Sequence, residues 1–254
     1  MFLSKFKSEN MKEKIIEFID RKVRDANSKG VVIGLSGGLD STTVLFLCVE
    51  ALGKDKVLGV MMPSEINKKE DLDDAIQVCK KLGVKYKIIK IDPILKSFEE
   101  SLDLIDKIVK GNLMTRIRMC ILYYFANKGK LLVGGTGNKS EYLQGYFTLH
   151  GDIACDFLPL GNLYKKNVKK LAEELRVPRK IIGKTPTAGL WPGQTDEGEI
   201  GITYEELDQI LPLLEKKISV EKIHKETNIE TEKIKRVKER MEKTEFKRKM
   251  IEKF

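Results

Sequence analysis

Two glycines, two serines and an aspartate stand together in the stretch SGGLDS, residues 36–41, which follows the apolar run VVIGL at residues 31–35. A turn that leaves a buried strand through glycines and enters a helix directs backbone N–H groups at one point, and the helix dipole favours negative charge there. The flanking serines add hydroxyl donors. The stretch therefore predicts a phosphate-binding loop, and the alternative is a glycine turn followed by an ordinary Asp or Ser helix cap.

Phosphate binding by itself does not explain Asp40. A carboxylate repels phosphate groups unless a divalent cation lies between them, so we interpret Asp40 as a magnesium ligand. The loop has no lysine that could reach a γ-phosphate. This composition suits a site that holds a pyrophosphate group while the α-phosphate of a nucleotide reacts.

Two better-known phosphate motifs are absent from the sequence. The nearest approach to a Walker A motif, VGGTGNKS, has Val133 and Asn138 where both glycines are required. The stretches GGLDST and GTGNKS each lack the third glycine of a dinucleotide-binding fingerprint. The pattern therefore excludes a Walker-type kinase and gives no dinucleotide fingerprint.

Strands and helices alternate along the first 160 residues. We expect helices over about 8–28, 41–52, 69–83 and 110–127, and strands over 31–35, 57–62, 85–91, 130–136 and 156–160. The alternation predicts an α/β fold, a Rossmann-like doubly wound parallel sheet of about five strands flanked by helices. Ligands of such sheets bind beyond the carboxyl ends of the strands, so the loops 34–41 and 134–141 should face each other.

From about residue 203 the pattern is helical only. We expect a single domain over residues 1–254, with a core at about 25–200 and a helical C-terminal extension at about 203–254. The net charge of +9 suits nucleic acid, nucleotides or pyrophosphate without choosing among them. Much of the excess lies in residues 233–254, which we interpret as a solvated helix face, the alternative being an RNA-binding or substrate-closing tail.

The remaining composition indicates a cytoplasmic protein. The sequence contains neither a signal peptide nor a run of about 18 apolar residues, so no membrane partner is expected. The four cysteines lie far apart with no C-x-x-C pair, and we expect them to be reduced structural thiols rather than a zinc site.

The loop SGGLDS resembles the pyrophosphatase loop of ATP-dependent amidating and thiolating enzymes. Further stretches resemble the NAD synthetase family in order over about residues 10–210: RIRM (116–119), GGTGNKSEYLQGYFTLHGD (134–152), DFLPLGNLYK (156–165) and KTPTAGLWPGQTDEGEIGITYEELD (184–208). The resemblance implies ATP-dependent amidation of deamido-NAD (nicotinic acid adenine dinucleotide) to NAD by ammonia. In that reaction the nicotinate is adenylated, AMP and pyrophosphate are released, ATP is a co-substrate and Mg²⁺ is the metal.

The resemblance also carries roles onto matching positions. Asp40, Asp152 and Lys165 would be catalytic, and Asp40 and Glu141 would bind the metal. Arg116, Asp156 and Lys247 would bind deamido-NAD, although Arg116 could instead be a helix-surface residue. ATP would be bound by Gly34, Leu35, Ser36, Gly37, Gly38, Leu39, Asp40, Ser41, Thr136, Lys165 and Thr187.

Residues 186–201 are rich in glycine and carry the only tryptophan, Trp191. We interpret them as a mobile loop that closes over ATP, with simple packing of the tryptophan as the alternative. Two positions depart from the family pattern. Leu149 followed by His150 stands where many members have a lysine, and Phe246 stands where they have a histidine. These departures leave the contacts with the dinucleotide open, with His150 as a candidate replacement.

The partners that the resemblance implies are small molecules and a second copy of the chain in a homodimer. Glutamine-using relatives carry an additional amidase domain for which this chain has no room, so we expect direct use of ammonia. The rival interpretation is a PP-loop ATP pyrophosphatase that acts on tRNA or another carboxylate. Thiolating enzymes of that kind generally need paired cysteines, which are absent here, so we do not expect a nucleic-acid partner.

Overall fold

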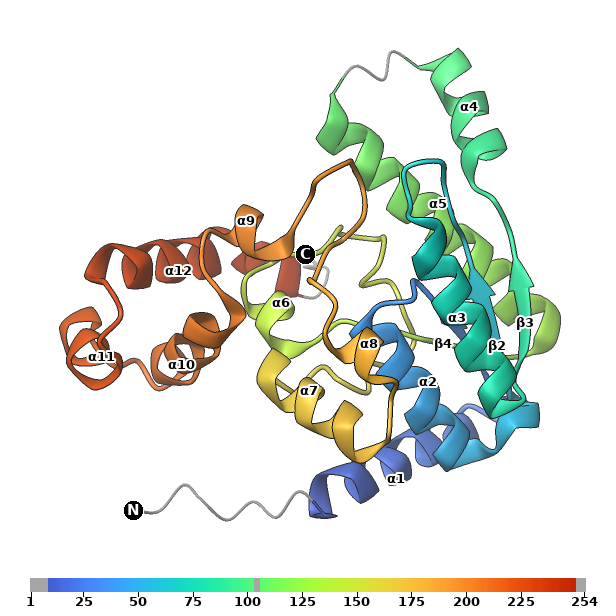
Figure 1. The fold of residues 1–254 in the computed structure, drawn as a ribbon, viewed down its shortest axis with the longest axis horizontal. Helices are drawn as coiled ribbons and strands as arrows, with labels where there is room; N and C mark the ends of the chain where they lie inside the picture. Colours follow the sequence, from blue (N-terminus) through green and yellow to red (C-terminus); the bar gives the residue numbers. More distant parts are fainter. Residues whose placement is uncertain (1–8, 103–105, 250–254) are drawn as a thin grey trace, which may run out of the picture.

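A computed structural model of the chain describes residues 9–102 and 106–249. Its centre is a parallel sheet in the order β3-β2-β1-β4, of which Figure 1 shows β2 and β3 side by side. In this sheet Val31 of β1 is aligned with Val57 of β2 and with Leu132 of β4. The strands are β1 (Val31–Gly34), β2 (Val57–Met61), β3 (Lys85–Ile88) and β4 (Leu132–Gly134). The predicted α/β fold with a helix-flanked parallel sheet is confirmed.

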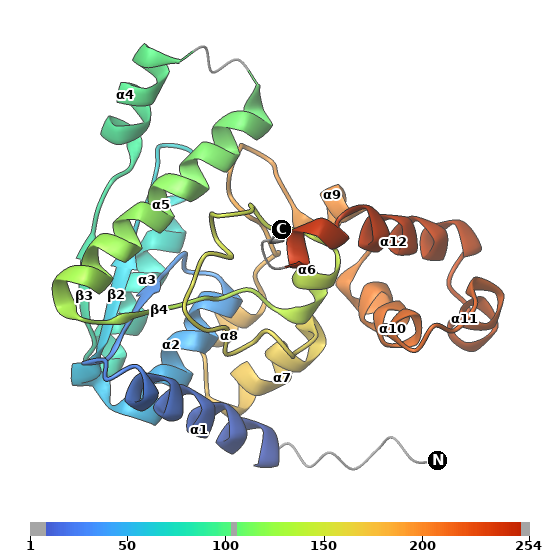
Figure 2. The ribbon, with the colours of Figure 1, turned by 180° about the vertical axis from the view of Figure 1, so that it is seen from behind.

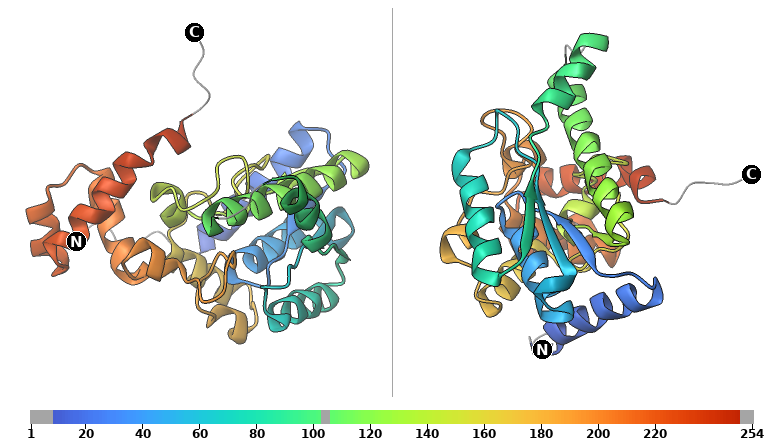
Figure 3. Two further views of the ribbon diagram at one scale, coloured as in Figure 1. Left: turned by 90° about the horizontal axis from the view of Figure 1, so that it is seen from above. Right: turned by 90° about the vertical axis from the view of Figure 1, so that its right-hand side faces the viewer.

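Helices cover both faces of the sheet because alternate strand residues point to opposite sides. Val31 and Ile33 belong to the hydrophobic core on one face, and Val32 and Val133 belong to the core on the other. The view along the sheet in Figure 3 places α3 and α5 on opposite sides. The first face carries α1 (Glu9–Asp25), α2 (Leu39–Leu52), α3 (Lys69–Leu82), α7 (Lys165–Glu174) and α8 (Arg179–Ile182), and the second carries α4 (Asp92–Ser101) and α5 (Lys107–Gly129).

Local sequence sets the ends of these helices. Gly83 ends α3 in a left-handed conformation (φ +67°), and its N–H group donates to the carbonyls of Cys79 and Lys80. The side chain of Asp106 caps α5 by accepting hydrogen bonds from the N–H groups of Ile108 and Val109. In the sequence, the end of α3 is marked by a glycine after an amphipathic run, and the start of α5 is marked by an aspartate before an apolar run.

The fifth strand expected over residues 156–160 is reduced to a single parallel bridge between Gly134 and Phe157. Two backbone hydrogen bonds hold this bridge, from the Asp156 N–H to the Val133 carbonyl and from the Gly135 N–H to the Phe157 carbonyl. Pairing stops soon after, since Pro159 has no N–H group to donate to a ladder. Helix α4 was not predicted; the strand expected over residues 85–91 ends at Ile88, and Pro93 lies in the first turn of α4.

The C-terminal helices have a hydrophobic core of their own, built around Leu207, Ile210, Ile223 and Ile234. They lie to one side of the sheet, as Figure 2 shows, and reach it through α6 (Lys139–Leu143), whose Leu143 joins their core. They comprise α9 (Asp196–Ile200), α10 (Tyr204–Glu215), α11 (Val220–Thr227) and α12 (Thr231–Lys243), followed by a short 3₁₀ helix at Glu245–Arg248. Another short 3₁₀ helix, Lys54–Lys56, lies between α2 and β2.

The basic segment 233–254 is described as far as residue 249, and residues 250–254 lie outside the described part of the chain. Within it, Lys238 and Lys249 pair with Glu242 and Glu245 at helical spacing, as on a solvated helix face, whereas Arg240 and Lys247 line a cavity. None of the described helices is long and apolar enough to cross a membrane.

Candidate active site

A cavity of about 510 Å³ opens beyond the carboxyl ends of β1 and β4. Gly34 ends β1 and Gly134 ends β4, and both line the cavity. From β1 the chain builds β2 and β3 on one side of the sheet, and β4 is added on the other, so the cavity lies at the point where strand order reverses. This is the position at which open α/β sheets bind ligands.

Residues 34–41, the phosphate loop, form one wall of the cavity, which all of them line except Gly37. The hydroxyls of Ser36 and Ser41 lie 3.1 Å apart, and the Ser36 hydroxyl accepts a hydrogen bond of 3.2 Å from the Gly38 N–H. No side chain caps the N-terminus of α2 at Gly38, so the alternative of an ordinary Asp or Ser cap does not apply. The first-turn N–H groups of α2 are left available to an anion.

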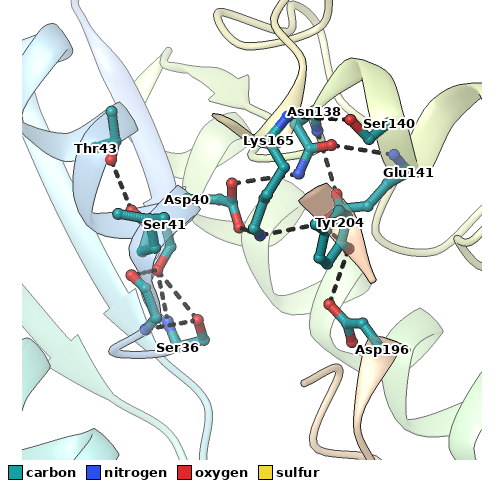
Figure 4. Close-up of polar contacts among 12 residues, drawn as sticks. Ser36, Asp40, Ser41, Thr43, Asn138, Ser140, Glu141, Lys165, Asp196 and Tyr204 are labelled. Atoms are coloured by element: carbon teal, nitrogen blue, oxygen red, sulfur yellow. Dashed lines mark hydrogen bonds and ion pairs between the residues drawn. The ribbon is translucent and has the colours of Figure 1, made fainter. Parts of the chain in front are cut away.

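Three charged side chains, one of them from the phosphate loop, meet beside the N-terminus of α2, as Figure 4 shows. The Lys165 ammonium forms an ion pair with Asp40, and its Nζ lies 3.5 Å from Oε1 of Glu141. Asn138 donates to Asp40 across 3.3 Å and forms a capping box with Glu141 at the start of α6. The two carboxylates, 101 positions apart in the chain, therefore converge on one cationic nitrogen, as the predicted topology requires.

Burial sets the electrostatics of this cluster. It raises the pKa of Glu141, an effect that the Lys165 cation opposes. Burial alone would lower the pKa of Lys165, but the neighbouring carboxylates of Asp40 and Glu141 outweigh it and raise that pKa. Lys165 is therefore held as a cation, and its charge is shared between two acids.

Tyr204 and Asp196 extend the cluster. The Tyr204 hydroxyl lies 3.1 Å from Oδ2 of Asp196 and 3.4 Å from Oε1 of Glu141, and its ring lies 5.0 Å from the Lys165 ammonium. Asp196 is only 4% exposed, and its Oδ1 has no hydrogen-bond partner among the residues that the structure describes. Three carboxylates around one ammonium leave the cluster short of positive charge. Neither residue was a sequence candidate, because nothing local in TDEGE or TYEE marks a contact with Glu141, 63 positions before Tyr204.

The donor set fits a magnesium ion. Asp40 and Glu141 offer hard carboxylate oxygens that already converge on a single positive centre. Within residues 9–102 and 106–249 there is no group of three or more His, Cys, Asp or Glu side chains that could enclose a metal. Magnesium does not need one, because it is usually held by one or two carboxylates together with substrate phosphates and water.

Most of the other predicted site residues also line the cavity, namely Thr136, Asp152, Thr187 and Lys247. Thr187 stabilises its own turn by donating to the carbonyl of Gln194 and accepting from the N–H of Gly189. Lys247 donates to the carbonyls of Gly145 and Phe147 at 2.8 Å each. Asp152 as a residue is exposed, but the protein around its carboxyl removes water and raises the pKa of that group.

Arg116 and Asp156 do not reach the cavity. Arg116 is exposed on α5 and donates to the carbonyl of Leu149 across 3.3 Å. Asp156 accepts hydrogen bonds from the Val133 N–H and the Tyr123 hydroxyl. Their assignment to deamido-NAD stays a prediction, and any such ligand has to extend outside the cavity of this chain to meet them.

Arg118, and not Arg116, is the arginine of RIRM that lines the cavity. Residues two apart on a helix face different directions, so only one of the pair could point inward. Arg118 donates to the Met62 carbonyl and to Oδ1 of Asn67, both across 3.1 Å, and burial lowers its pKa to about 10. Arg240 and Lys184 are further cavity residues that sequence reasoning missed.

Trp191 lines the cavity and also packs against the N-terminal part of α5. Its ring lies 5.3 Å from the Lys107 ammonium, and a Cβ atom at Gly111 would lie 3.4 Å from it. Trp191 therefore both packs against α5 and borders the cavity. Closure of residues 186–201 over ATP stays a prediction.

Comparison with known proteins is consistent across sequence and structure. A family model described as NAD synthase matches residues 11–251. The chain is 55% identical, over 244 residues that cover 94% of both chains, to an NH₃-dependent NAD⁺ synthetase of Methanocaldococcus jannaschii. An NMN synthetase from Francisella tularensis superposes with a TM-score of 0.87 and 32% identity, covering 98% of this chain and 99% of that one. An NH₃-dependent NAD synthetase from Campylobacter jejuni, in complex with nitrate, superposes with a TM-score of 0.84 and 36% identity. The match covers 98% of this chain and 100% of that one.

Proposed function

Because the chain belongs to the NAD synthase family, we propose that it is an ammonia-dependent NAD⁺ synthetase that amidates deamido-NAD at the expense of ATP. This agrees with the family resemblance of the sequence motifs. The observation that carries the proposal is the convergence of Asp40 and Glu141 on Lys165, beside the uncapped N-terminus of α2 at the sheet's switch point.

The chemistry needs an activated carboxylate. Ammonia does not displace oxygen from a free carboxylate, whereas an acyl adenylate has a good leaving group in AMP. We assign the phosphate loop to the departing pyrophosphate, which its N–H groups and the Ser36 and Ser41 hydroxyls would bind. Lys165 would neutralise negative charge that develops between the α- and β-phosphates.

Asp40 and Glu141 are the residues that would hold Mg²⁺. When bound, the ion would supply additional neutralisation of the leaving pyrophosphate. Asn138 supports both ligands, since it donates to Asp40 and caps the helix that carries Glu141.

Asp152 is the proposed residue for ammonia. A carboxylate attracts ammonium, and one whose pKa is raised by desolvation accepts a proton more readily. Arg116, Asp156 and Lys247 are proposed to contact the dinucleotide, which would run from the cavity onto the outer surface at α5. We also propose a homodimer in the cytoplasm; the four unpaired cysteines suit a reducing compartment.

The test is NAD formation by the purified chain from deamido-NAD, ATP, magnesium and ammonium, beside Asp40→Asn and Glu141→Gln. NAD with equimolar AMP, lost in both variants, supports the proposal. Nicotinic acid mononucleotide is the competing acceptor, since a relative at 32% identity is an NMN synthetase. A higher kcat/KM for the mononucleotide, or ATP cleavage only with tRNA, would reject the substrate assignment. Light scattering and replacement of ammonium by glutamine test the dimer and the nitrogen source.

A further inference from the structure

Lys184 occupies an unusual position behind the phosphate loop. Its Nζ lies 2.9 Å from the carbonyl oxygen of Gly37, 2.6 Å from Oδ1 of Asp71 and 2.7 Å from Oδ2 of Asp74. A lysine ammonium has three N–H bonds, and these three acceptors use all of them. None remains to bind a phosphate, although Lys184 borders the cavity.

The contact with Gly37 bears on the orientation of one peptide group. In a trans peptide the carbonyl of residue 37 and the N–H of residue 38 point in opposite directions. Lys184 draws the Gly37 carbonyl toward α3, and the Gly38 N–H is turned toward the hydroxyl of Ser36. If this peptide flipped, a carbonyl oxygen would replace an N–H donor in the loop and would repel a phosphate.

Glycine makes such a flip easy unless something opposes it. Gly37 has a φ of +78°, and both flanking residues of the peptide lack a Cβ atom. The backbone of Asp71 also packs closely against Gly37: a Cβ atom at Gly37 would lie 2.0 Å from the Asp71 carbonyl oxygen. Gly37 is therefore held between the backbone of Asp71 and the ammonium that the Asp71 carboxylate fixes.

We propose that Lys184 is a positioning residue that fixes the Gly37–Gly38 peptide, so that its N–H holds the Ser36 hydroxyl at the site of the ATP phosphates. The proposal rests on the proposed function in taking residues 34–41 to bind those phosphates. Lys184 lies just before residues 186–201, the segment that we predict to close over ATP. Its contact with Gly37 therefore connects this segment to the phosphate loop.

A purely structural ion pair would not need this arrangement. Lys180, one turn earlier, already pairs with Asp74 and is 55% exposed, against 24% for Lys184. Burial by itself would lower the pKa of Lys184, but contact with Asp71 and Asp74 outweighs it and raises that pKa. Lys180 does not contact the loop or line the cavity, which makes it a matched control.

The experiment compares Lys184→Met, Lys184→Arg and Lys180→Met in the full-length protein. Lys184→Met should raise the KM for ATP, and the calorimetric Kd for magnesium pyrophosphate, by about tenfold, as expected for one lost hydrogen bond from a charged donor. The KM for deamido-NAD should stay within about twofold, since the pyrophosphate-binding loop alone is altered. Lys184→Arg should recover most of the loss, and Lys180→Met should match the wild type.

Equal effects of Lys184→Met and Lys180→Met would overturn the proposal, and so would an unchanged pyrophosphate affinity in Lys184→Met. If Lys184→Met does not fold, Lys184→Gln provides a neutral, polar side chain with a shorter stem and permits the same comparison. Failure of the wild type to make NAD would instead refute the proposed function, while pyrophosphate binding by calorimetry would still test Lys184.

Discussion

Replacing Lys165 by methionine is the sharpest perturbation of the charged cluster. Methionine keeps most of the volume of the stem, so the change removes a charge rather than packing. The Lys165 side chain is 8% exposed, and those of Asp40 and Glu141 are 19% and 18% exposed. The variant would leave two mostly buried carboxylates facing each other without a cation.

The expected cost follows from this burial. Removing one partner of a fully buried pair costs about 3–5 kcal/mol. Because both carboxylates retain some contact with water, we expect a loss near the lower limit, about 3 kcal/mol. For a chain of this size that corresponds to a fall of about 6–12 °C in the unfolding midpoint.

Magnesium should reverse part of this loss in the variant and have little effect on the wild type. In the wild type the ammonium lies where the two carboxylates converge, so a metal has to compete with it. In the variant the carboxylates are free, and magnesium at about 100 times its Kd would add about 2.7 kcal/mol. The assay is thermal unfolding by circular dichroism, with EDTA or with millimolar magnesium, without nucleotide.

The pH dependence has a definite sign. Burial already raises the pKa of Glu141, and removal of Lys165 should raise it further. A carboxyl whose folded pKa exceeds its unfolded value stabilises the fold at low pH, and this stabilisation is lost as pH rises through the folded pKa. The deficit of Lys165→Met should therefore be larger at pH 8 than at pH 5. If the variant is as stable as the wild type in EDTA, the buried-pair reasoning is refuted. If magnesium does not stabilise the variant, the inference that magnesium and the Lys165 ammonium occupy the same position is refuted.

Three further outcomes are expected. Gly37→Ala, which forces a Cβ atom to within 2.0 Å of the Asp71 carbonyl oxygen at φ +78°, should lower the free energy of unfolding, measured by urea denaturation, by at least about 1–3 kcal/mol. Gly38→Ala should cost less, and equal losses would contradict the strain argument. Leu207→Ala, at a fully buried position of the C-terminal core, should cost about 2–5 kcal/mol in the same assay while the KM for ATP stays near its normal value, and a cost below about 1 kcal/mol would mean that this core is poorly packed. Burial raises the pKa of Cys155 to about 11, so its alkylation by iodoacetamide, followed by mass spectrometry, should be slow at pH 8 and accelerate about tenfold per pH unit toward pH 10 as thiolate forms. ATP, by filling the cavity that Cys155 lines, should slow the reaction, and a rate independent of pH would exclude this titration.

The sequence by itself determined the main features of the fold and the centre of the site. Alternating apolar and amphipathic runs specify strands and helices locally, and glycines and prolines mark their ends, so the parallel sheet could be predicted. The phosphate loop was readable because its chemistry lies within eight consecutive residues. Asp40 and Glu141 could be placed face to face, since both follow strands whose carboxyl ends share one edge of the sheet.

Tertiary packing decided the rest. Which arginine of RIRM points inward depends on how α5 rotates against the sheet, and Arg118 rather than Arg116 lines the cavity. The approach of Tyr204 to Glu141, and of Lys184 to the carbonyl of Gly37, joins segments 63 and 147 positions apart. Local sequence carries no signal for such contacts, because they arise only when separately formed elements bury their apolar faces against one another and bring their polar ends together.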